Sequence, residues 1–123
     1  GENPHIAFND PPADFDDESA YKIVELNKTC RIQQVREGWF SSIDDVFSHA
    51  ITMTCRQIMK CDIILSVVPY KVKAKAIELT LKSEKTNLVP ATVLKEHKDC
   101  TVFCDKYSVS MVGKDLLEKY LEK

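Results

Sequence analysis

The sequence predicts an α/β fold in which helices flank a mostly parallel sheet. Segments of strand character alternate with segments of helical spacing along the 123 residues, which is typical of βαβ units. Residues 62–68 form a nearly continuous apolar run, and such a run indicates a strand that is buried on both faces of a parallel sheet. With 44% hydrophobic and 29% charged residues, this length suits a single domain with a modest core.

The expected elements follow one another closely. In chain order they are a strand at 21–26, a helix at 29–35, a strand at 50–54, a helix at 55–60, a strand at 62–68, helices at 70–82 and 90–96, a strand at 100–104 and a helix at 113–121. Thr29 is the candidate N-cap of the first helix, and Gly38 is its expected stop. Trp39 and Phe40 come next and are expected to anchor packing.

Helical spacing is clearest in the longest expected helix, where Val72, Ala76 and Leu79 recur on one face. Glu78 and Lys82 stand four residues apart on this helix and are expected to form an ion pair.

The charge balance excludes some classes of partner. The chain has 17 basic and 19 acidic side chains, and its net charge of −2 leaves no basic surplus to favour nucleic acid or an anionic membrane. Its longest apolar run is too short to span a bilayer.

The acidic run at 14–18 lies in an expected loop and is interpreted as a solvated face, with metal capture as the lesser alternative. The chain opens with neither Met nor a signal peptide, so we expect a trimmed or fragmentary product.

The cysteines indicate a reducing, cytoplasmic setting. They number five, an odd count, and stand at irregular positions 30, 55, 61, 100 and 104, which argues against a disulfide framework. Cys100 and Cys104 share one face of an expected strand, where burial in the core is favoured. No second Cys or His pair lies at zinc-ligand spacing, so we expect neither a metal nor a cofactor.

The candidate site begins near the start of the chain, in the stretch from His5 to Asp10. Histidine changes charge near neutral pH, and a carboxylate within reach can fix its tautomer and basicity. Ligands of open α/β sheets bind outside the carboxyl ends of the strands, which adds the corner at 68–73 and the loop after Cys104. No glycine-rich loop follows an expected strand, so the main phosphate loop for any phosphorylated ligand would lie outside this chain.

The stretch GENPHIAFNDPP resembles the signature loop of the glucosamine-6-phosphate deaminase/isomerase family, usually written G-x-[DN]-G-H-I-[AG]-F-N-[DE]-P. The resemblance continues in the family's order through CRIQQVREGWF, HAITMT and ILSVVPYKVKAKAI; the first motif is specific and the others support it. It extends over the C-terminal half of a family member only. The resemblance implies that residues 1–123 are a single domain fragment, the C-terminal part of a doubly wound, Rossmann-like sheet.

The reaction implied by the resemblance converts glucosamine 6-phosphate to fructose 6-phosphate and ammonia, and a related hexose phosphate is the alternative substrate. Opening the sugar ring needs a base at the C1 hydroxyl and an acid at the ring oxygen, and one imidazole can serve both in turn. By resemblance His5 has that role. Asp10 stands where the family has an acid that orients the histidine, and Asn3 stands where many members have an aspartate that completes the relay.

The resemblance also implies residues that bind the phosphate of a small sugar phosphate. Lys73 matches the family's lysine at the start of a helix, where a cation adds to the oriented backbone amides. Arg36 falls near the family's phosphate-contacting arginine, and Arg31 is the other candidate; the alignment does not separate them.

Three positions depart from the family's pattern. Pro4 replaces a glycine, which removes an N–H and the option of a positive φ. Asn3 can orient a partner by hydrogen bonds but carries no charge. Tyr70 stands where the corner commonly has a glycine and crowds a turn that would face the substrate. An altered substrate choice or weak activity is therefore an open alternative.

Two other functions remain in competition with the isomerase/deaminase. A 6-phosphogluconolactonase-like hydrolase also has a Gly-His loop, but the Ile-Ala-Phe-Asn-Asp continuation favours the isomerase. A non-catalytic sugar-phosphate-binding or sensor domain fits the altered loop, but the retention of His5 and Asp10 speaks against it. The chain alone is expected to be inactive, and its uncovered edge and apolar face predict self-association or pairing with the missing N-terminal half.

Overall fold

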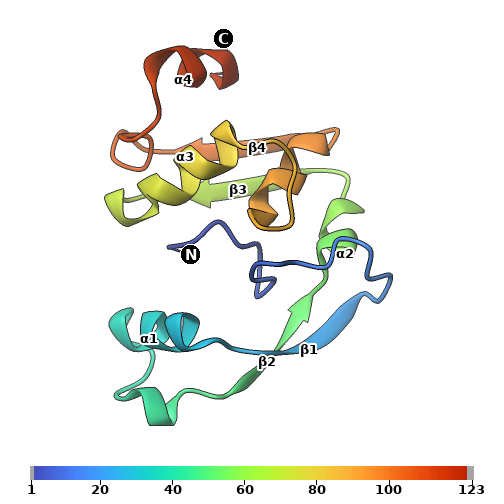
Figure 1. Ribbon diagram of the computed structural model, residues 1–123, viewed down its shortest axis with the longest axis vertical. Coiled ribbons are helices and arrows are strands. Elements are labelled where there is room, and N and C mark those ends of the chain that lie inside the picture. The colour runs from blue at the N-terminus through green and yellow to red at the C-terminus, as the bar shows by residue number, and fades with distance from the viewer. Residues whose placement is uncertain (1, 122–123) are drawn as a thin grey trace.

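The computed structural model describes residues 2–121 and shows the α/β order of elements that the sequence predicts (Figure 1). The elements are β1 (Tyr21–Glu25), α1 (Lys28–Arg36), the 3₁₀ helix η1 (Ile43–Asp45), β2 (His49–Met53), α2 (Cys55–Met59), β3 (Ile64–Val68), the 3₁₀ helix η2 (Lys71–Lys73), α3 (Ala74–Lys82), the 3₁₀ helix η3 (Pro90–Glu96), β4 (Cys100–Cys104) and α4 (Lys114–Tyr120). The helix expected at 70–82 thus begins as a 3₁₀ turn, and the one at 90–96 is 3₁₀ throughout.

The strands form two separate pairs. β3 and β4 are parallel, with Ile64 opposite Cys100 and Val68 opposite Cys104. β1 and β2 are antiparallel, with Tyr21 opposite Met53. The prediction of a mostly parallel sheet is therefore right for β3–β4 and wrong for β1–β2, because an alternating pattern does not encode the direction in which the next strand returns. Within residues 2–121 no strand joins the two pairs into one sheet.

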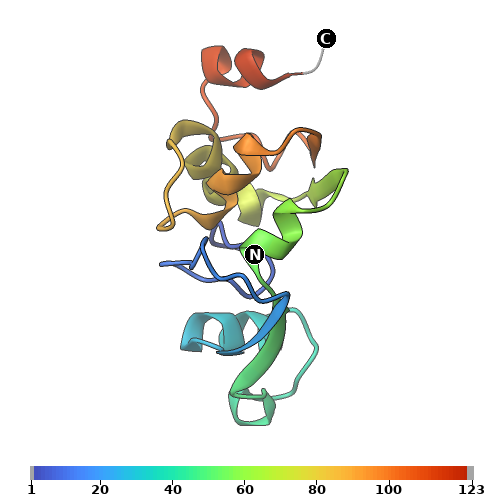
Figure 2. The same ribbon diagram turned by 90° about the vertical axis from the view of Figure 1, so that its right-hand side faces the viewer.

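The molecule is elongated, with the two strand pairs in different parts of it (Figures 1 and 2). β1, β2 and α1 lie towards one end, and α4 lies at the other. α3 and η3 lie on the same face of the β3–β4 pair, and α3 buries Ala74, Ala76 and Ile77. No helix among residues 2–121 is long and apolar enough to cross a bilayer.

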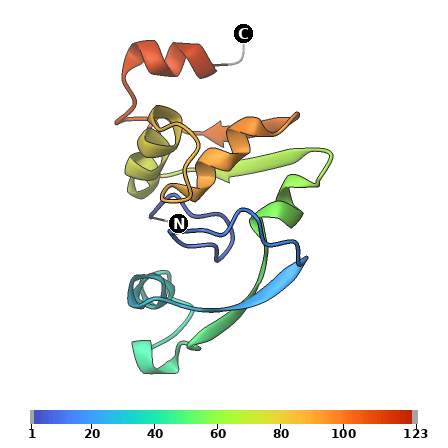
Figure 3. The same cartoon turned by 45° about the vertical axis from the view of Figure 1, so that its right-hand side comes forward.

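The N-terminal loop, residues 2–13, lies between the strand pairs and is bonded to both parts (Figure 3). The Ala91 N–H donates to the Pro4 carbonyl over 2.8 Å, on the side of η3. On the side of β2, the Asn9 amide donates to the Met53 carbonyl over 2.8 Å. Pro4 is buried and centres a tight turn in which the His5 N–H donates to the Asn3 carbonyl. The proline thus serves a turn that needs no donor at its own position.

α1 extends one residue beyond the expected helix at each end, and its N-cap differs from the prediction. Asn27, rather than Thr29, is the N-cap, because its side-chain oxygen accepts from the Cys30 N–H over 2.8 Å. Gly38 follows the helix with φ +84°, as a C-terminal glycine should. The prediction that Trp39 anchors packing is wrong, because its side chain is 72% exposed.

The prediction that β3 is buried on both faces is also wrong. Leu65 and Val67 are 66% and 72% exposed, because no described element covers the face opposite α3. On β4, Cys100 is half-buried and Cys104 is exposed, so the expected core burial of these thiols is not found. The predicted ion pair of Glu78 with Lys82 is replaced by one with Lys75, at 2.7 Å.

Tyr70 has φ +78° and ψ +146°, a combination that a side chain disfavours and that glycine tolerates. Tyr70→Gly is therefore expected to raise the free energy of unfolding by about 1 kcal/mol, the strain released less the added chain entropy. Tyr70→Ala, which retains the Cβ atom, is the control and should give little gain. Chemical denaturation of both variants measures the difference; an equal effect of the two substitutions would contradict it.

Candidate functional site

Three segments that carry the predicted site residues converge on one part of the molecule. The N-terminal loop, the C-terminal end of α1 and the corner between β3 and α3 lie near one another in Figures 1 and 3. Arg36 on α1 forms an ion pair with Glu2 of the loop, with 2.5 Å between Nη1 and Oε1. The charge of Lys73 acts both on His5 and on Glu37, which follows α1. The structure therefore brings His5, Arg36 and Lys73 into one neighbourhood.

His5 has one ring nitrogen, Nε2, with no hydrogen-bond partner within residues 2–121. Its Nδ1 donates to the carbonyl of Ala7, a residue with φ +50°, and this bond selects the tautomer whose Nε2 carries a lone pair. Burial lowers the pKa of His5 below its ordinary value, and the positive charge of Lys73 adds to that, against the raising effects of the Ala7 bond and of Asp10. A neutral imidazole with a free nitrogen can accept a proton at neutral pH.

Asp10 acts on His5 through its charge rather than through a hydrogen bond. Its Oδ2 accepts from the Asn27 amide over 2.7 Å, while the His5 ring bonds to Ala7. The backbone carbonyl of Ala7 thus orients the imidazole, which is the task that the resemblance gives to Asp10. Asn27 was not found from the sequence, which placed the helix cap at Thr29, and nothing in the sequence pointed to its second bond to Asp10.

Asn3 supports the loop mainly through its backbone. Its carbonyl accepts from the His5 N–H over 2.9 Å. Its side-chain Oδ1 is buried and has no hydrogen-bond partner among the described residues. The relay position of the family is therefore occupied here by a side chain with no bond to either His5 or Asp10.

The structure separates the two candidate arginines. Arg31 donates from Nη2 to the carbonyls of Ile43 and Val46, over 2.7 and 3.2 Å, and so closes the loop after α1. The side chain of Arg36 is 60% exposed and forms its ion pair with Glu2 through Nη1. Arg31 is half-buried and engaged in holding the fold, whereas Arg36 is exposed.

Arg31→Met should therefore destabilise the protein, because the loop carbonyls lose charged donors. We expect the free energy of unfolding to fall by about 2–3 kcal/mol. Arg36→Met is the matched control, since it removes an exposed ion pair and should change stability by less than about 1 kcal/mol. Urea denaturation of the two variants tests this, and a larger loss from the Arg36 substitution would reverse the assignment.

The corner that carries Lys73 is fixed from the end of β4. The Tyr70 N–H donates to Asp105 Oδ2 over 2.9 Å, and the Tyr70 carbonyl accepts from the Lys73 N–H over 3.0 Å. The Tyr70 bond is the main cause of a lowered pKa of the Asp105 carboxyl group, with bonds from Ser108 and Tyr107 adding to it. Asp105 lies in the predicted loop after Cys104, but the sequence did not single it out; an aspartate directly after a strand was the available signal.

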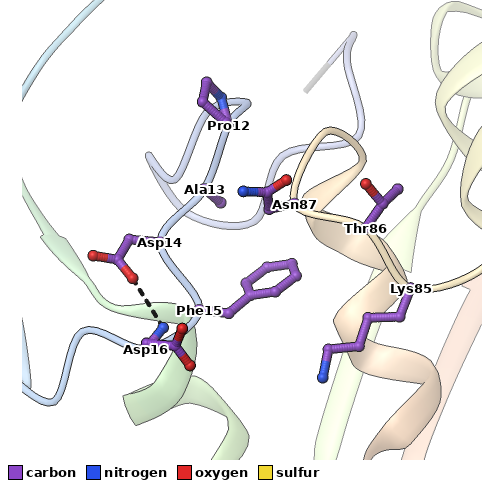
Figure 4. A pocket seen from close by; sticks show the side chains of 8 residues that line it. All are labelled: Pro12, Ala13, Asp14, Phe15, Asp16, Lys85, Thr86 and Asn87. Atoms are coloured by element: carbon purple, nitrogen blue, oxygen red, sulfur yellow. Dashed lines mark hydrogen bonds between the residues drawn. The ribbon is translucent and has the colours of Figure 1, made fainter.

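The acidic run and its surroundings form a hollow elsewhere on the chain (Figure 4). It has a volume of about 440 Å³ and its walls come from residues 12–16 and 85–87. Asp14 uses a carboxylate oxygen to accept from the N–H groups of Asp16 and Asp17, so part of the run serves its own turn. A second hollow, of about 540 Å³, lies beside Arg31 and Asn27. No group of three or more potential metal ligands is found in residues 2–121.

Comparisons with known proteins agree with this class of fold. No family model matches the chain. In structure, the chain is similar to a protein described as a monomeric glucosamine-6-phosphate deaminase and as a missing link of the NagB superfamily, with a TM-score of 0.83 and 35% identity. The match covers 90% of this chain and 44% of the other. The chain therefore has the α/β fold of part of a NagB-superfamily protein.

The chain is also similar to curated proteins that share one name. The chain is 38% identical over 120 residues to glucosamine-6-phosphate deaminase from Bacillus cytotoxicus, and 37% identical to the enzyme of the same name from Bacillus cereus. Each match covers 98% of this chain, whereas the chain spans 44% of the length of these relatives. The resemblance to the glucosamine-6-phosphate deaminase family that the sequence predicts is thus confirmed.

Proposed function

We propose that this chain forms part of an aldose–ketose isomerase/deaminase that acts on glucosamine 6-phosphate or a related hexose phosphate. The observation that carries the proposal is the state of His5. Ala7 holds its Nδ1, its Nε2 has no hydrogen-bond partner among the described residues, and its lowered pKa favours the neutral imidazole. The sequence similarity to glucosamine-6-phosphate deaminases supports the same assignment.

In the proposed reaction His5 opens the sugar ring. Its Nε2 takes the proton of the C1 hydroxyl and returns a proton to the ring oxygen, so the bond from C1 to that oxygen breaks and an aldehyde forms. The charge of Asp10 stabilises the imidazolium that exists between the two transfers. Proton transfer between C1 and C2 and loss of the amine would then need groups outside this chain.

Lys73 and Arg36 would bind the phosphate. Lys73 stands at the N-cap position of α3 and makes no side-chain hydrogen bond or ion pair within residues 2–121. Arg36 reaches the same neighbourhood from α1 and is exposed. Guanidinium and ammonium groups together give a bidentate partner and a point charge for a phosphate.

We propose further that β3–β4 continues into a larger, doubly wound parallel sheet in the full-length protein. Leu65 and Val67 expose an apolar face that the remaining sequence would cover. In the isolated chain a second copy would cover it instead, which predicts self-association by light scattering. A cytoplasmic location fits the free cysteines of this chain.

The non-catalytic sensor remains the second candidate because one observation favours it. Tyr70 holds a strained backbone at the corner where the family commonly has a glycine, so the substrate side of this site is altered. A sensor would bind the sugar phosphate without turnover. The lactonase differs in its substrate, since it would hydrolyse a sugar lactone phosphate and release no ammonia.

Ammonia release from glucosamine 6-phosphate tests the proposal. We expect release by the full-length protein and none by the 123-residue chain, because the main phosphate loop and the second proton-transfer group lie outside it. Turnover by the purified chain would contradict the division of the site. Tight binding of glucosamine 6-phosphate by the full-length protein without ammonia, unchanged by His5→Ala, would favour the sensor.

A further inference from the structure

Tyr70 combines a strained backbone with a largely exposed side chain. Its φ of +78° and ψ of +146° lie in a region that is almost reserved for glycine. Its side chain is 68% exposed and belongs to none of the aromatic or cation–π pairs found in residues 2–121. Burial of the ring therefore does not offset the strain. Strain of this kind is typical of functional positions.

The backbone that carries the ring is held firmly in spite of this strain. The Tyr70 N–H donates to Asp105, whose carboxylate also accepts from the N–H groups of Tyr107 and Ser108 over 3.0 and 2.7 Å. The end of β4 thus fixes the direction in which the chain leaves β3. Because the backbone at Tyr70 is fixed, the Cα atom from which the ring extends has a defined position next to the corner. Such preorganisation lowers the entropy that a binding residue loses when a ligand binds.

The ring originates beside the proposed phosphate site. Tyr70 lies two residues after the carboxyl end of β3, where ligands of α/β folds bind, and its carbonyl accepts from the Lys73 N–H. Lys73 in turn is close enough to His5 for its charge to act there. A sugar that extends from its phosphate at Lys73 to its C1 end at His5 would therefore begin beside Tyr70.

We propose that Tyr70 is the specificity-determining residue of this site, and that its ring contacts the sugar rather than the phosphate. This inference rests on the proposed function. The carbon-bound hydrogens of a hexose present an apolar face that packs on an aromatic ring, and the phenol can bond a sugar hydroxyl. A glycine at this position has no group for either contact.

Calorimetry on the full-length protein tests the proposal with two ligands, glucosamine 6-phosphate and inorganic phosphate. Tyr70→Ala retains the Cβ atom and the strained backbone but removes the ring. We expect it to weaken binding of glucosamine 6-phosphate by about two- to tenfold and to leave the affinity for inorganic phosphate unchanged. Tyr70→Phe retains the ring and should retain most of the affinity for the sugar phosphate.

The outcomes distinguish this inference from the proposed function. Equal weakening of both ligands by Tyr70→Ala would show that the residue shapes the phosphate corner, and no effect on either would show that it has no binding role; each overturns the inference while the proposed function stands. A wild-type protein that binds inorganic phosphate but not glucosamine 6-phosphate would overturn the proposed function and this inference with it.

Discussion

His5→Gln is expected to lower kcat for ammonia release by the full-length protein about 10²- to 10⁴-fold. Glutamine keeps a hydrogen-bonding side chain of similar reach but cannot take up and return a proton. Because Nδ1 of His5 is bonded to Ala7, the proton transfer that the substitution removes is the one made by Nε2. The matched control is His49→Gln on β2, an exposed histidine whose Nδ1 contacts Ser48, and it should leave kcat unchanged.

The binding of a ring-opened analogue separates chemistry from folding in the His5 variant. The reduced, open-chain amino alditol 6-phosphate needs no ring opening, so His5→Gln should bind it nearly as well as the wild type. A variant that loses this binding as well would indicate a structural role for His5. Unchanged kcat in His5→Gln would refute the ring-opening assignment.

Lys73→Met is expected to raise KM for glucosamine 6-phosphate about 10- to 100-fold, since it removes a charged partner of the phosphate. Methionine keeps the length of the side chain without its charge. Lys75→Met is the control on the same helix, because Lys75 is paired with Glu78 and should change KM less than about twofold. An equal rise in both variants would point to the net charge of α3 rather than to a phosphate contact.

Lys73→Met is also expected to change the pH dependence of kcat/KM in a defined direction. Burial is the main cause that lowers the pKa of His5, and Lys73 adds a smaller effect, so the acid limb of the kcat/KM profile should lie below pH 6.5. Removing the charge at position 73 raises the pKa of His5, and the limb should move to higher pH. Asp10→Asn removes a charge of the opposite sign and should move the limb to lower pH. Shifts of the reverse sign would contradict the electrostatic account.

The order of the elements could be predicted from the sequence because local patterns decide it. The apolar run of β3, the spacing in α3 and the glycine after α1 each act within a few residues. Strand direction and burial depend on residues distant in the chain. This is why the antiparallel return of β2 and the exposure of Leu65 and Trp39 differed from the prediction.

The candidate site was predictable in its residue types but not in its bonds. The HIAFND motif pointed to His5 and Asp10 as candidates, yet the partner of the imidazole is a backbone carbonyl, which no side-chain pattern reveals. Arg31 and Arg36 lie on the same short helix, and only the loop that Arg31 closes separates their roles. Asn27 and Asp105 act through contacts 17 and 35 residues away in sequence.

Histidine NMR of the full-length protein tests most directly whether His5 faces the sugar. The His5 resonances, assigned with His5→Gln, should titrate below pH 6.5 in the free protein and shift when glucosamine 6-phosphate binds. His49 contacts Ser48 and His97 contacts the Cys61 carbonyl through a ring nitrogen. The resonances of these two histidines should not shift when glucosamine 6-phosphate binds. Saturated binding of glucosamine 6-phosphate with no change at His5 would contradict the account.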